Sequence, residues 1–365
     1  MNFTLPQLLK ALIDQKGSDL HLSPETPPRL RIDGALLPLD VQALTPQDCM
    51  QLCYSVLTDE QRKTFEEQHE LDLAFTVKNL SRFRANIYMQ KGHVSGAFRV
   101  IPFKTYTLQE LHLPPVIEKI CSLPRGLVLI TGPTGSGKST TLAAMINHIN
   151  ETRQDHILTI EDPVEFVHPH KQSLVNQREV GQDTKSFARA LKSALRQDPD
   201  VVLVGELRDL ETIGLAVTTA ETGHLVFGTL HTNSCISTMS RIIDVFPGDQ
   251  QPQIRNQLAG NLQATISQTL MPTQGGGRVV AMEIMIPNAA IRNLIREDKL
   301  NQIYTAMQTG QDQTSMITLN QSLLQLVQGR QITPQAAIEV SYEPQELEML
   351  LSSKLGIKVQ ATLKR

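Results

Sequence analysis

Apolar and polar residues alternate with two different periods in the first hundred positions. A helical spacing of apolar residues predicts an amphipathic helix near the start of the chain, at Leu5, Leu8, Leu9, Leu12 and Ile13. A two-residue period follows in RLRID and ALLPL, which predicts a hairpin with its turn at Asp33 and Gly34. A second helix is expected from Thr45 to about Leu57, followed by three strands in LDLAFTV, RFRANIYMQ and HVSGAFRVI. Residues 1–101 are therefore predicted to form an antiparallel α+β domain.

A different pattern begins at Arg125. The short apolar runs GLVLIT, HILTI, VVLV and HLVFGTL are separated by helical stretches, which is typical of a parallel sheet with crossover helices. Residues 102–124 are interpreted as a linker with one or two short helices, and helix-like segments dominate from about residue 287 to 348. We therefore predict an α/β nucleotide-binding domain over residues 125–365 with a helical C-terminal region.

Composition narrows the function classes. A chain of 365 residues with 40% hydrophobic and 19% charged residues suits about two folded domains. The net charge of −3 argues against nucleic acid as the main ligand. Four cysteines without a CxxC pair fit a reducing cytosol. No apolar run approaches the ~18 residues that span a bilayer, so we expect no direct membrane insertion, and any membrane association would come through partners.

The strand GLVLIT is followed directly by a phosphate-binding signature. Residues 132–139 read GPTGSGKS, which matches G-x-x-x-x-G-K-[ST], and a helix is expected from about Ser139 to Ile149. Glycines let the loop curl so that its amides face phosphates, Lys138 would reach the β- and γ-phosphates, and Ser139 would ligate magnesium. ATP and Mg²⁺ are therefore expected, bound by Gly132, Thr134, Gly135, Ser136, Gly137, Lys138, Ser139 and Thr140.

Two downstream strands end in carboxylates. The buried-strand pattern DVVLV ends in Gly205 and Glu206, where a glutamate replaces the usual magnesium-binding aspartate. The strand HILTI is expected to bring Glu161, Asp162 and Glu165 to the same end of the sheet, where they could position or activate the attacking water. The alternatives from the pattern alone are a surface glutamate at a strand end and a solvated acidic loop.

Several cations stay ambiguous on pattern alone. His224 and His231 flank the strand LVFGTL, where a structural histidine is more common than one that contacts phosphate or senses it. Arg82, Arg84 and Arg99 could supply positive charge to a transferring phosphate or simply line a solvated strand face. The segment His168-Pro169-His170 lacks partners at a metal-binding spacing and is interpreted as a loop.

Together these motifs resemble the secretion ATPase superfamily of type II secretion and type IV pili. The stretch LRQDPDVVLVGELRD fits the family signature L-R-x-x-P-D-x-x-x-x-G-E-x-R-D, HILTIEDPVEF looks like its Asp box, and AETGHLVFGTLHTN looks like its His box. The order of the motifs is also that of the family. The segments GSDLHL, SRFRANIY and AIRNLIRE resemble the pilus retraction motors of this family, and the last is associated with retraction.

The resemblance implies a PAS-like first domain, a RecA-like second domain and a homo-hexameric ring. It implies that Glu206 is the Walker B acid and metal ligand, and that Glu165 activates water. Arg84 and Arg99 match arginines that meet the γ-phosphate, and the resemblance also favours functional roles for His231 and for the nucleotide-binding candidates Glu161 and His224.

The implied function is a cytoplasmic ATPase, peripheral to the inner membrane, that drives pilus retraction and twitching motility. An inner-membrane pilus platform protein is the expected partner, with room for a paralogous retraction ATPase as well. The absence of a tetracysteine zinc module and of a further N-terminal domain departs from the pattern of extension motors. Alternatives are an accessory retraction ATPase, a secretion or extension motor, a nucleotide-gated scaffold without appreciable hydrolysis, and a DNA-translocating ring.

Overall fold

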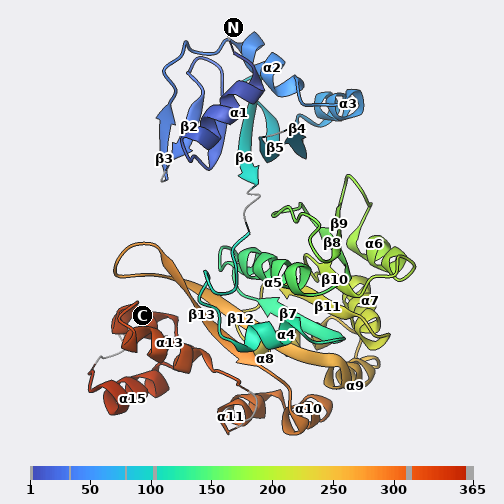
Figure 1. Cartoon of the computed structure of the whole chain (residues 1–365), viewed down its shortest axis with the longest axis vertical. Helices are drawn as coiled ribbons and strands as arrows, with labels where there is room; N and C mark the ends of the chain where they lie inside the picture. Colours follow the sequence, from blue (N-terminus) through green and yellow to red (C-terminus); the bar gives the residue numbers. More distant parts are fainter. Residues whose placement is uncertain (1–2, 33, 79, 102–104, 310–314, 359–365) are drawn as a thin grey trace. The chain divides into compact units, whose positions relative to one another are not determined.

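In a computed structural model, the chain is described at residues 3–32, 34–78, 80–101, 105–309 and 315–358. Its contacts divide it into two compact units, one of residues 1–104 with 165–167 and the other of residues 105–164 with 168–365. The first unit contains α1 (Leu5–Asp14), β1 (Asp19–Leu22), β2 (Arg29–Ile32), β3 (Ala35–Pro38), α2 (Pro46–Tyr54), α3 (Asp59–Gln68), β4 (Glu70–Val77), β5 (Ser81–Gln90) and β6 (His93–Ile101) (Figure 1).

The first unit is built on one antiparallel sheet with the strand order β3-β2-β1-β6-β5-β4. The helix α1 forms where predicted, and its Leu5, Leu9 and Leu12 are buried in the same core as Phe83 and Phe98 of the sheet. The antiparallel α+β architecture predicted for this part of the chain is therefore confirmed. Gly34 takes the left-handed backbone (φ 86°) expected in the hairpin turn, whereas Asp33 lies outside the described residues.

In β5 the two faces of the sheet differ as the sequence predicts. Phe83, Ala85 and Ile87 are buried, whereas Arg84 on the opposite face is exposed. The pairing of β5 with β6 places Arg84 directly opposite Arg99. Because directly paired residues lie on the same face of an antiparallel sheet, these two arginines are neighbours.

The second unit contains one larger sheet with helices on both sides (Figure 1). Its elements are α4 (Val116–Cys121), β7 (Gly126–Thr131), α5 (Lys138–Thr152), β8 (His156–Glu161), β9 (Leu174–Glu179), α6 (Phe187–Ala194), β10 (Val201–Val204), α7 (Leu210–Glu221), β11 (Leu225–Leu230), α8 (Cys235–Asp244), α9 (Gln251–Asn261), β12 (Leu262–Pro272), β13 (Arg278–Met285), α10 (Ala289–Arg296), η1 (Leu300–Gln302), α11 (Ile303–Thr309), α13 (Leu319–Gln328), α14 (Pro334–Val340) and α15 (Pro344–Leu355).

The strand order of this sheet is β13-β12-β7-β11-β10-β8-β9, and every neighbouring pair is parallel except β12 with β13. Alternate residues of β7 point to opposite faces: Leu127 and Leu129 pack with helices α6 to α11, whereas Val128 and Ile130 pack with α4 and α5. Continuous apolar runs such as GLVLIT are required here because both faces of each central strand are buried. The predicted α/β fold is confirmed.

Three strands of this sheet were not predicted. The four predicted strands became β7, β8, β10 and β11, and the structure adds β9, β12 and β13. Residues 105–124, predicted as a connection, contain α4, and its Ile117 and Ile120 pack against α5 in the core of the second unit.

The C-terminal helices form a separate layer. In α13 and α15, Leu323 and Leu351 are buried with Met271 of β12 and Ala281 of β13. The helix α15 begins inside the helix-like region predicted to end near residue 348 and continues beyond it to Leu355. This layer lies on the β12–β13 side of the sheet, where α13 packs against β13 (Figure 1).

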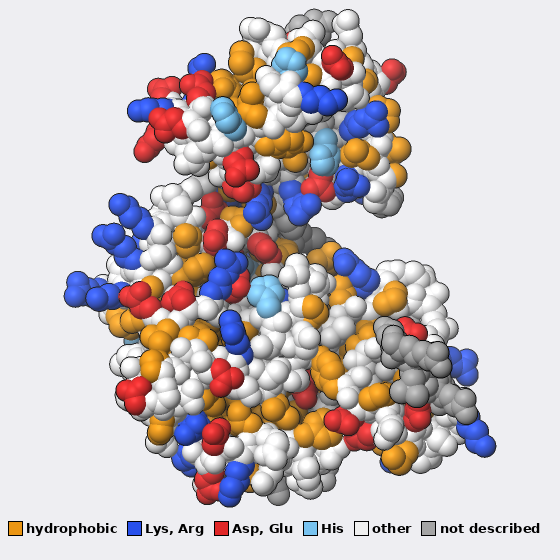
Figure 2. Space-filling view, turned by 180° about the vertical axis from the view of Figure 1, so that it is seen from behind, with side chains coloured by type: hydrophobic (Ala, Val, Ile, Leu, Met, Phe, Trp, Pro, Cys, Tyr) orange, Lys and Arg blue, Asp and Glu red, His pale blue; other side chains and the backbone are white. Residues whose placement is uncertain are grey.

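The surface mixes charged and apolar side chains. On the face drawn in Figure 2, acidic and basic side chains are interspersed with apolar ones on each unit. Within the described part of the chain, every helix is too short or too polar to cross a bilayer.

Candidate functional site

The loop of residues 132–137, called the P-loop below, connects the end of β7 to the start of α5. Gly132, Gly135 and Gly137 have φ angles of 141°, 82° and 89°, in the region that favours glycine. A Cβ at Gly132 would stand 2.3 Å from the main-chain oxygen of Gln268, so the loop also lacks room for a side chain there. The sequence context required of a phosphate-binding loop, strand then loop then helix, is therefore present in the structure.

Lys138 is the first residue of α5. Its Nζ donates hydrogen bonds to the carbonyl oxygens of Gly132 at 2.7 Å and Pro133 at 3.1 Å. The ammonium group therefore lies over the loop at the N-terminus of a helix of 15 residues. Loop amides, the helix terminus and this ammonium together favour a phosphate chain. Ser139 and Thr140, both half-buried, follow in the first turn, and Thr134 is exposed at the tip of the loop.

Gln268 on β12 supports the loop from below, and sequence reasoning missed it. Its Nε2 donates a 2.8 Å hydrogen bond to the main-chain oxygen of Ser136, and both residues are buried. The only signal available was the apolar alternation in ATISQTL, which becomes informative once this segment is known to be the strand next to β7.

Glu206 follows β10 at the end of the sheet where the loop 132–137 follows β7. Its carboxylate lies 2.6 Å from Arg208 Nη2 and 3.3 Å from His231 Nε2. The hydrogen bond from Arg208, with help from His231, holds the pKa of Glu206 below its usual range, so the group is ionised at neutral pH. The structure therefore joins the predicted Walker B acid to His231 of the predicted His box.

Glu161 ends β8, two strands from β11 in the sheet. One carboxylate oxygen accepts hydrogen bonds from Thr159 Oγ1 at 2.6 Å and from Gln177 Nε2 at 3.1 Å. These contacts orient the carboxylate at the edge of the sheet where the P-loop and Glu206 also lie, because β7, β8 and β10 run parallel. Glu161 and Glu206 therefore lie at the same end of the sheet, as expected.

His224 lies at the opposite end of the sheet. It precedes β11, its main-chain oxygen accepts from Gly126 at the start of β7, and its Nδ1 lies 3.0 Å from the oxygen of Thr219. The P-loop follows the other end of β7, about 20 Å away for a strand of six residues. Within one chain, His224 is therefore separated from the P-loop, whereas His231 is on the P-loop edge.

The remaining predicted residues fall in the first unit. Arg99 Nε pairs with Asp19 at 2.7 Å, and Arg84 Nη2 lies 4.0 Å from Asp72. Glu165 is grouped with this unit as well. The second unit thus contains Lys138, Glu206 and the other motif residues without these three. The segment 168–170 is a loop, as predicted.

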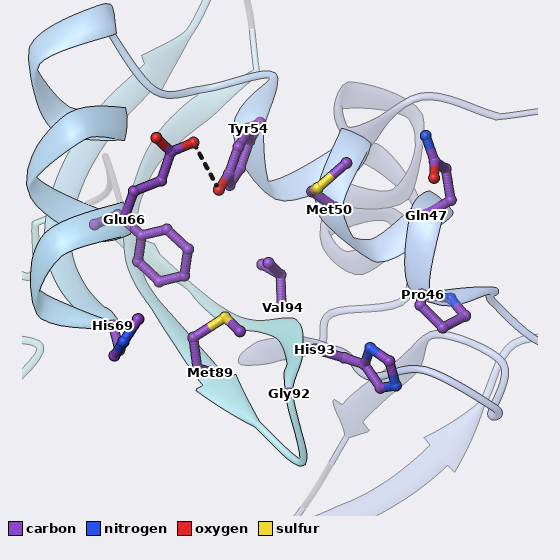
Figure 3. A pocket seen from close by; sticks show the side chains of 11 residues that line it. Pro46, Gln47, Met50, Tyr54, Glu66, His69, Met89, Gly92, His93 and Val94 are labelled. Atoms are coloured by element: carbon purple, nitrogen blue, oxygen red, sulfur yellow. Dashed lines mark hydrogen bonds between the residues drawn. The ribbon is translucent and has the colours of Figure 1, made fainter.

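The first unit also has a hollow of about 320 Å³ between α2, α3 and the β5–β6 turn (Figure 3). Met50, Met89 and Val94 give it an apolar wall, and the Glu66 carboxylate accepts a 3.3 Å hydrogen bond from Tyr54 Oη. This lining differs from the glycine-rich loop and lysine of the P-loop.

The chain is similar to known proteins over most of its length. A model of the type II/IV secretion system protein family matches residues 3–275. The chain is 51% identical over 341 residues to the type IV pilus retraction ATPase PilT of Pseudomonas aeruginosa, covering 93% of this chain and 99% of the relative. It is 38% identical to the type IV pilus ATPase PilU of the same organism, covering 97% and 92%.

A solved structure extends the likeness to three dimensions. The crystal structure of the pilus retraction motor PilT with bound ADP superposes with a TM-score of 0.90 at 51% identity, over 95% of this chain and 100% of that one. The family model and the relatives of high identity together show that the chain belongs to the family of type II/IV secretion system proteins.

Proposed function

We propose that this chain is an ATP-hydrolysing motor that drives type IV pilus retraction, the pilus disassembly that underlies twitching motility. The observation that carries the proposal is a complete P-loop beside the ionised Glu206 carboxylate, which contacts His231, in a chain 51% identical to a pilus retraction ATPase over nearly its whole length. The lower identity to PilU, 38%, makes an accessory retraction ATPase the second candidate.

In this proposal the P-loop binds the ATP phosphates. The amides of residues 132–137 and the N-terminus of α5 surround them, and Lys138 exchanges the carbonyls of Gly132 and Pro133 for the β- and γ-phosphates. Glu161, at the same end of the sheet, would contact the bound nucleotide. Because His224 lies at the other end of the sheet, we infer that it meets the nucleotide of a neighbouring copy.

The oxygen donors at this edge suit magnesium. Within the described ranges, no group of three or more His, Cys, Asp or Glu side chains could hold a metal by itself. Magnesium is commonly held by one or two protein oxygens and by substrate phosphates, which fits the Ser139 hydroxyl and the Glu206 carboxylate. The bound ion would neutralise charge that develops on the phosphates. Arg208 and His231 keep Glu206 ionised and oriented for this role.

The hydrolytic step would use residues of both units. We assign the activation of water to Glu165 and the stabilisation of γ-phosphate charge to Arg84 and Arg99, which are neighbours on β5 and β6. Closure between the two domains would then gate turnover, because hydrolysis requires these groups to be assembled at the phosphates. Coupling of closure to hydrolysis is how the motor would perform mechanical work.

The assembly is part of the proposal. Six copies would form a homo-hexameric ring in the cytoplasm, peripheral to the inner membrane through a pilus platform protein, with a paralogous retraction ATPase as a further candidate partner. Residues 1–101 would act as a PAS-like domain and 125–365 as a RecA-like ATPase domain with a helical C-terminal region. The predicted linker 102–124 would join them, with its helix α4 packed in the core of the second unit.

Two experiments test this function. Purified chain should release phosphate from ATP, and Glu165→Gln should abolish release while retaining ATP binding, with Glu67→Gln on the surface of α3 as the control. Cells that lack the gene should be piliated but non-motile, and the gene should restore motility where its Lys138→Ala form does not. Normal motility in the deletion strain would rule out the retraction role, and stimulation of turnover by DNA would favour a DNA-translocating ring.

A further inference from the structure

The C-terminal helical layer contains a contact that the proposed function does not use. The loop between α14 and α15, residues 341–343, lies far from the P-loop in the sequence. Asn320 of α13 is buried, with only 2% of its surface exposed. It makes hydrogen bonds to this loop on both sides of Tyr342. Its Nδ2 donates to the oxygen of Glu343 at 3.0 Å, and its Oδ1 accepts from Ser341 Oγ at 2.6 Å. The backbone at Tyr342 is therefore fixed by the core of this layer.

From this fixed position Tyr342 contacts the loop between β11 and α8, residues 231–234. Its hydroxyl donates a hydrogen bond to the main-chain oxygen of Asn233. That same oxygen accepts a second hydrogen bond, of 2.7 Å, from Ser267 Oγ on β12. Burial raises the pKa of Tyr342 above its ordinary value, so the phenol keeps the proton that it donates.

Asn233 lies two residues after His231, whose Nε2 is 3.3 Å from the Glu206 carboxylate. The far side of the same loop is also fixed, because the Cys235 amide at the start of α8 donates a 2.7 Å hydrogen bond to the buried Glu283 carboxylate. The segment between His231 and α8 is thus held by Tyr342 and Ser267 at its centre and by Glu283 at its end. A small displacement of Asn233 would move His231 relative to Glu206.

We propose that Tyr342 is a positioning residue for His231, and that the C-terminal helical layer thereby controls the rate of ATP hydrolysis. The inference rests on the proposed ATPase function. A partner or conformational change that displaces the 341–343 loop would slow turnover without touching the P-loop.

The test compares Tyr342→Phe, which removes only the hydroxyl, with Tyr106→Phe as a matched control. Both tyrosines are 46% exposed and belong to the second unit. We expect Tyr342→Phe to lower kcat three- to tenfold while the KM for ATP changes less than twofold, since its effect reaches Glu206 and not Lys138. Tyr106→Phe should match the wild type. A normal kcat in Tyr342→Phe would overturn the proposal.

A double-mutant cycle separates positioning from general destabilisation. If Tyr342 acts through His231, Tyr342→Phe should change the single-turnover rate less than twofold in a His231→Gln background. An equal fold-change in both backgrounds would overturn the proposal. Wild-type turnover is measured in the same series, so an inactive wild type would refute the proposed function and not this inference.

Amide hydrogen exchange supplies a readout that does not depend on turnover. Tyr342→Phe should speed exchange at residues 231–235 and leave residues 132–138 unchanged. Ser341→Ala, which weakens the hold of Asn320 on the loop, should reproduce the effect if Tyr342→Phe folds poorly. Unchanged exchange at 231–235 in both variants would overturn the proposal.

Discussion

The side-chain amide of Gln268 donates a 2.8 Å hydrogen bond to the main-chain oxygen of Ser136, across 132 positions of sequence. The strand β12 thereby contacts the phosphate-binding loop from its buried side. Since the main-chain oxygen of Gln268 also occupies the space that a side chain at Gly132 would need, the loop is shaped by its neighbour in the sheet as well as by its glycines.

Replacing Gln268 with alanine should weaken nucleotide binding. The change leaves the buried Ser136 oxygen without its partner, at a cost of about 1–3 kcal/mol, and part of that cost falls on the geometry of the loop. We expect an increase of about five- to tenfold in the Kd for ADP, measured by calorimetry. Gln325→Ala on the exposed side of α13 is the control, and an equal Kd in the two variants would contradict the prediction.

Removing the Arg208 guanidinium should move the acidic limb of the pH–rate profile. Arg208 is the main reason why the pKa of Glu206 lies below its usual range, so Arg208→Gln should raise that pKa. If Glu206 must be ionised for hydrolysis, turnover should then decline at a higher pH than in the wild type. Arg241→Gln on α8 should keep the wild-type profile, and a profile for Arg208→Gln that superposes on it would refute the assignment.

His168 should make the chain less stable in weak acid. Burial lowers its pKa to about 4, whereas an unfolded histidine titrates near 6.5. Between these values the unfolded chain binds a proton that the folded chain does not, so the free energy of unfolding falls as the pH falls, by up to about 3 kcal/mol in total. Above pH 6.5 this contribution to the pH dependence vanishes.

Urea unfolding at several pH values checks this expectation. His168→Gln should remove the slope that His168 contributes between pH 6.5 and 4, whatever its own stability at neutral pH. His112→Asn, at an exposed histidine with a left-handed backbone that asparagine tolerates, should retain the wild-type slope. Equal slopes in wild type and His168→Gln would contradict the prediction, because His168 would then bind its proton over the same pH range in the folded and unfolded chains.

The four cysteines should be unreactive in the folded chain. All are buried, and burial raises the thiol pKa of Cys49 to about 11 and those of Cys53 and Cys121 to about 12; the pKa of Cys235 is raised as well. Thiolates are the reactive species, so a thiol reagent should label the native chain slowly and all four sites rapidly in denaturant. A fast phase in the native chain would contradict the buried positions.

The sequence predicted best what depends on local pattern. The strand GLVLIT and the P-loop glycines carry their own signals, because a doubly buried strand is apolar throughout and a left-handed turn favours glycine. The strand β12 was missed because α9 ends at Asn261 and β12 begins at Leu262, with no turn residues between them to mark the change of period. The partly polar strand β9, LVNQRE, lies at the edge of the sheet and lacks a continuous apolar run.

The candidate site also contains residues that a local sequence pattern indicates and residues that it does not. Lys138 and Glu206 were found because each belongs to a recognisable motif that follows an apolar strand. The separation of His224 from His231 required strand direction, since the two flank LVFGTL and only the parallel pairing of β7 with β11 places His231 on the P-loop edge. Gln268 and Tyr342 act through contacts with Ser136 and Asn233 that are remote in sequence, so no single-chain pattern indicates them.

A ligand must compete with the two hydrogen bonds that Lys138 makes to its own loop. An incoming molecule must attract the ammonium more strongly than the carbonyl oxygens of Gly132 and Pro133 do together. The terminal phosphates of a nucleoside di- or triphosphate provide that attraction, because they carry full negative charges where the lysine can reach them. A nucleoside monophosphate offers no group at that distance along the chain of phosphates. We therefore expect the loop to discriminate between nucleotides by the length of their phosphate chain, so that AMP competes poorly with ATP.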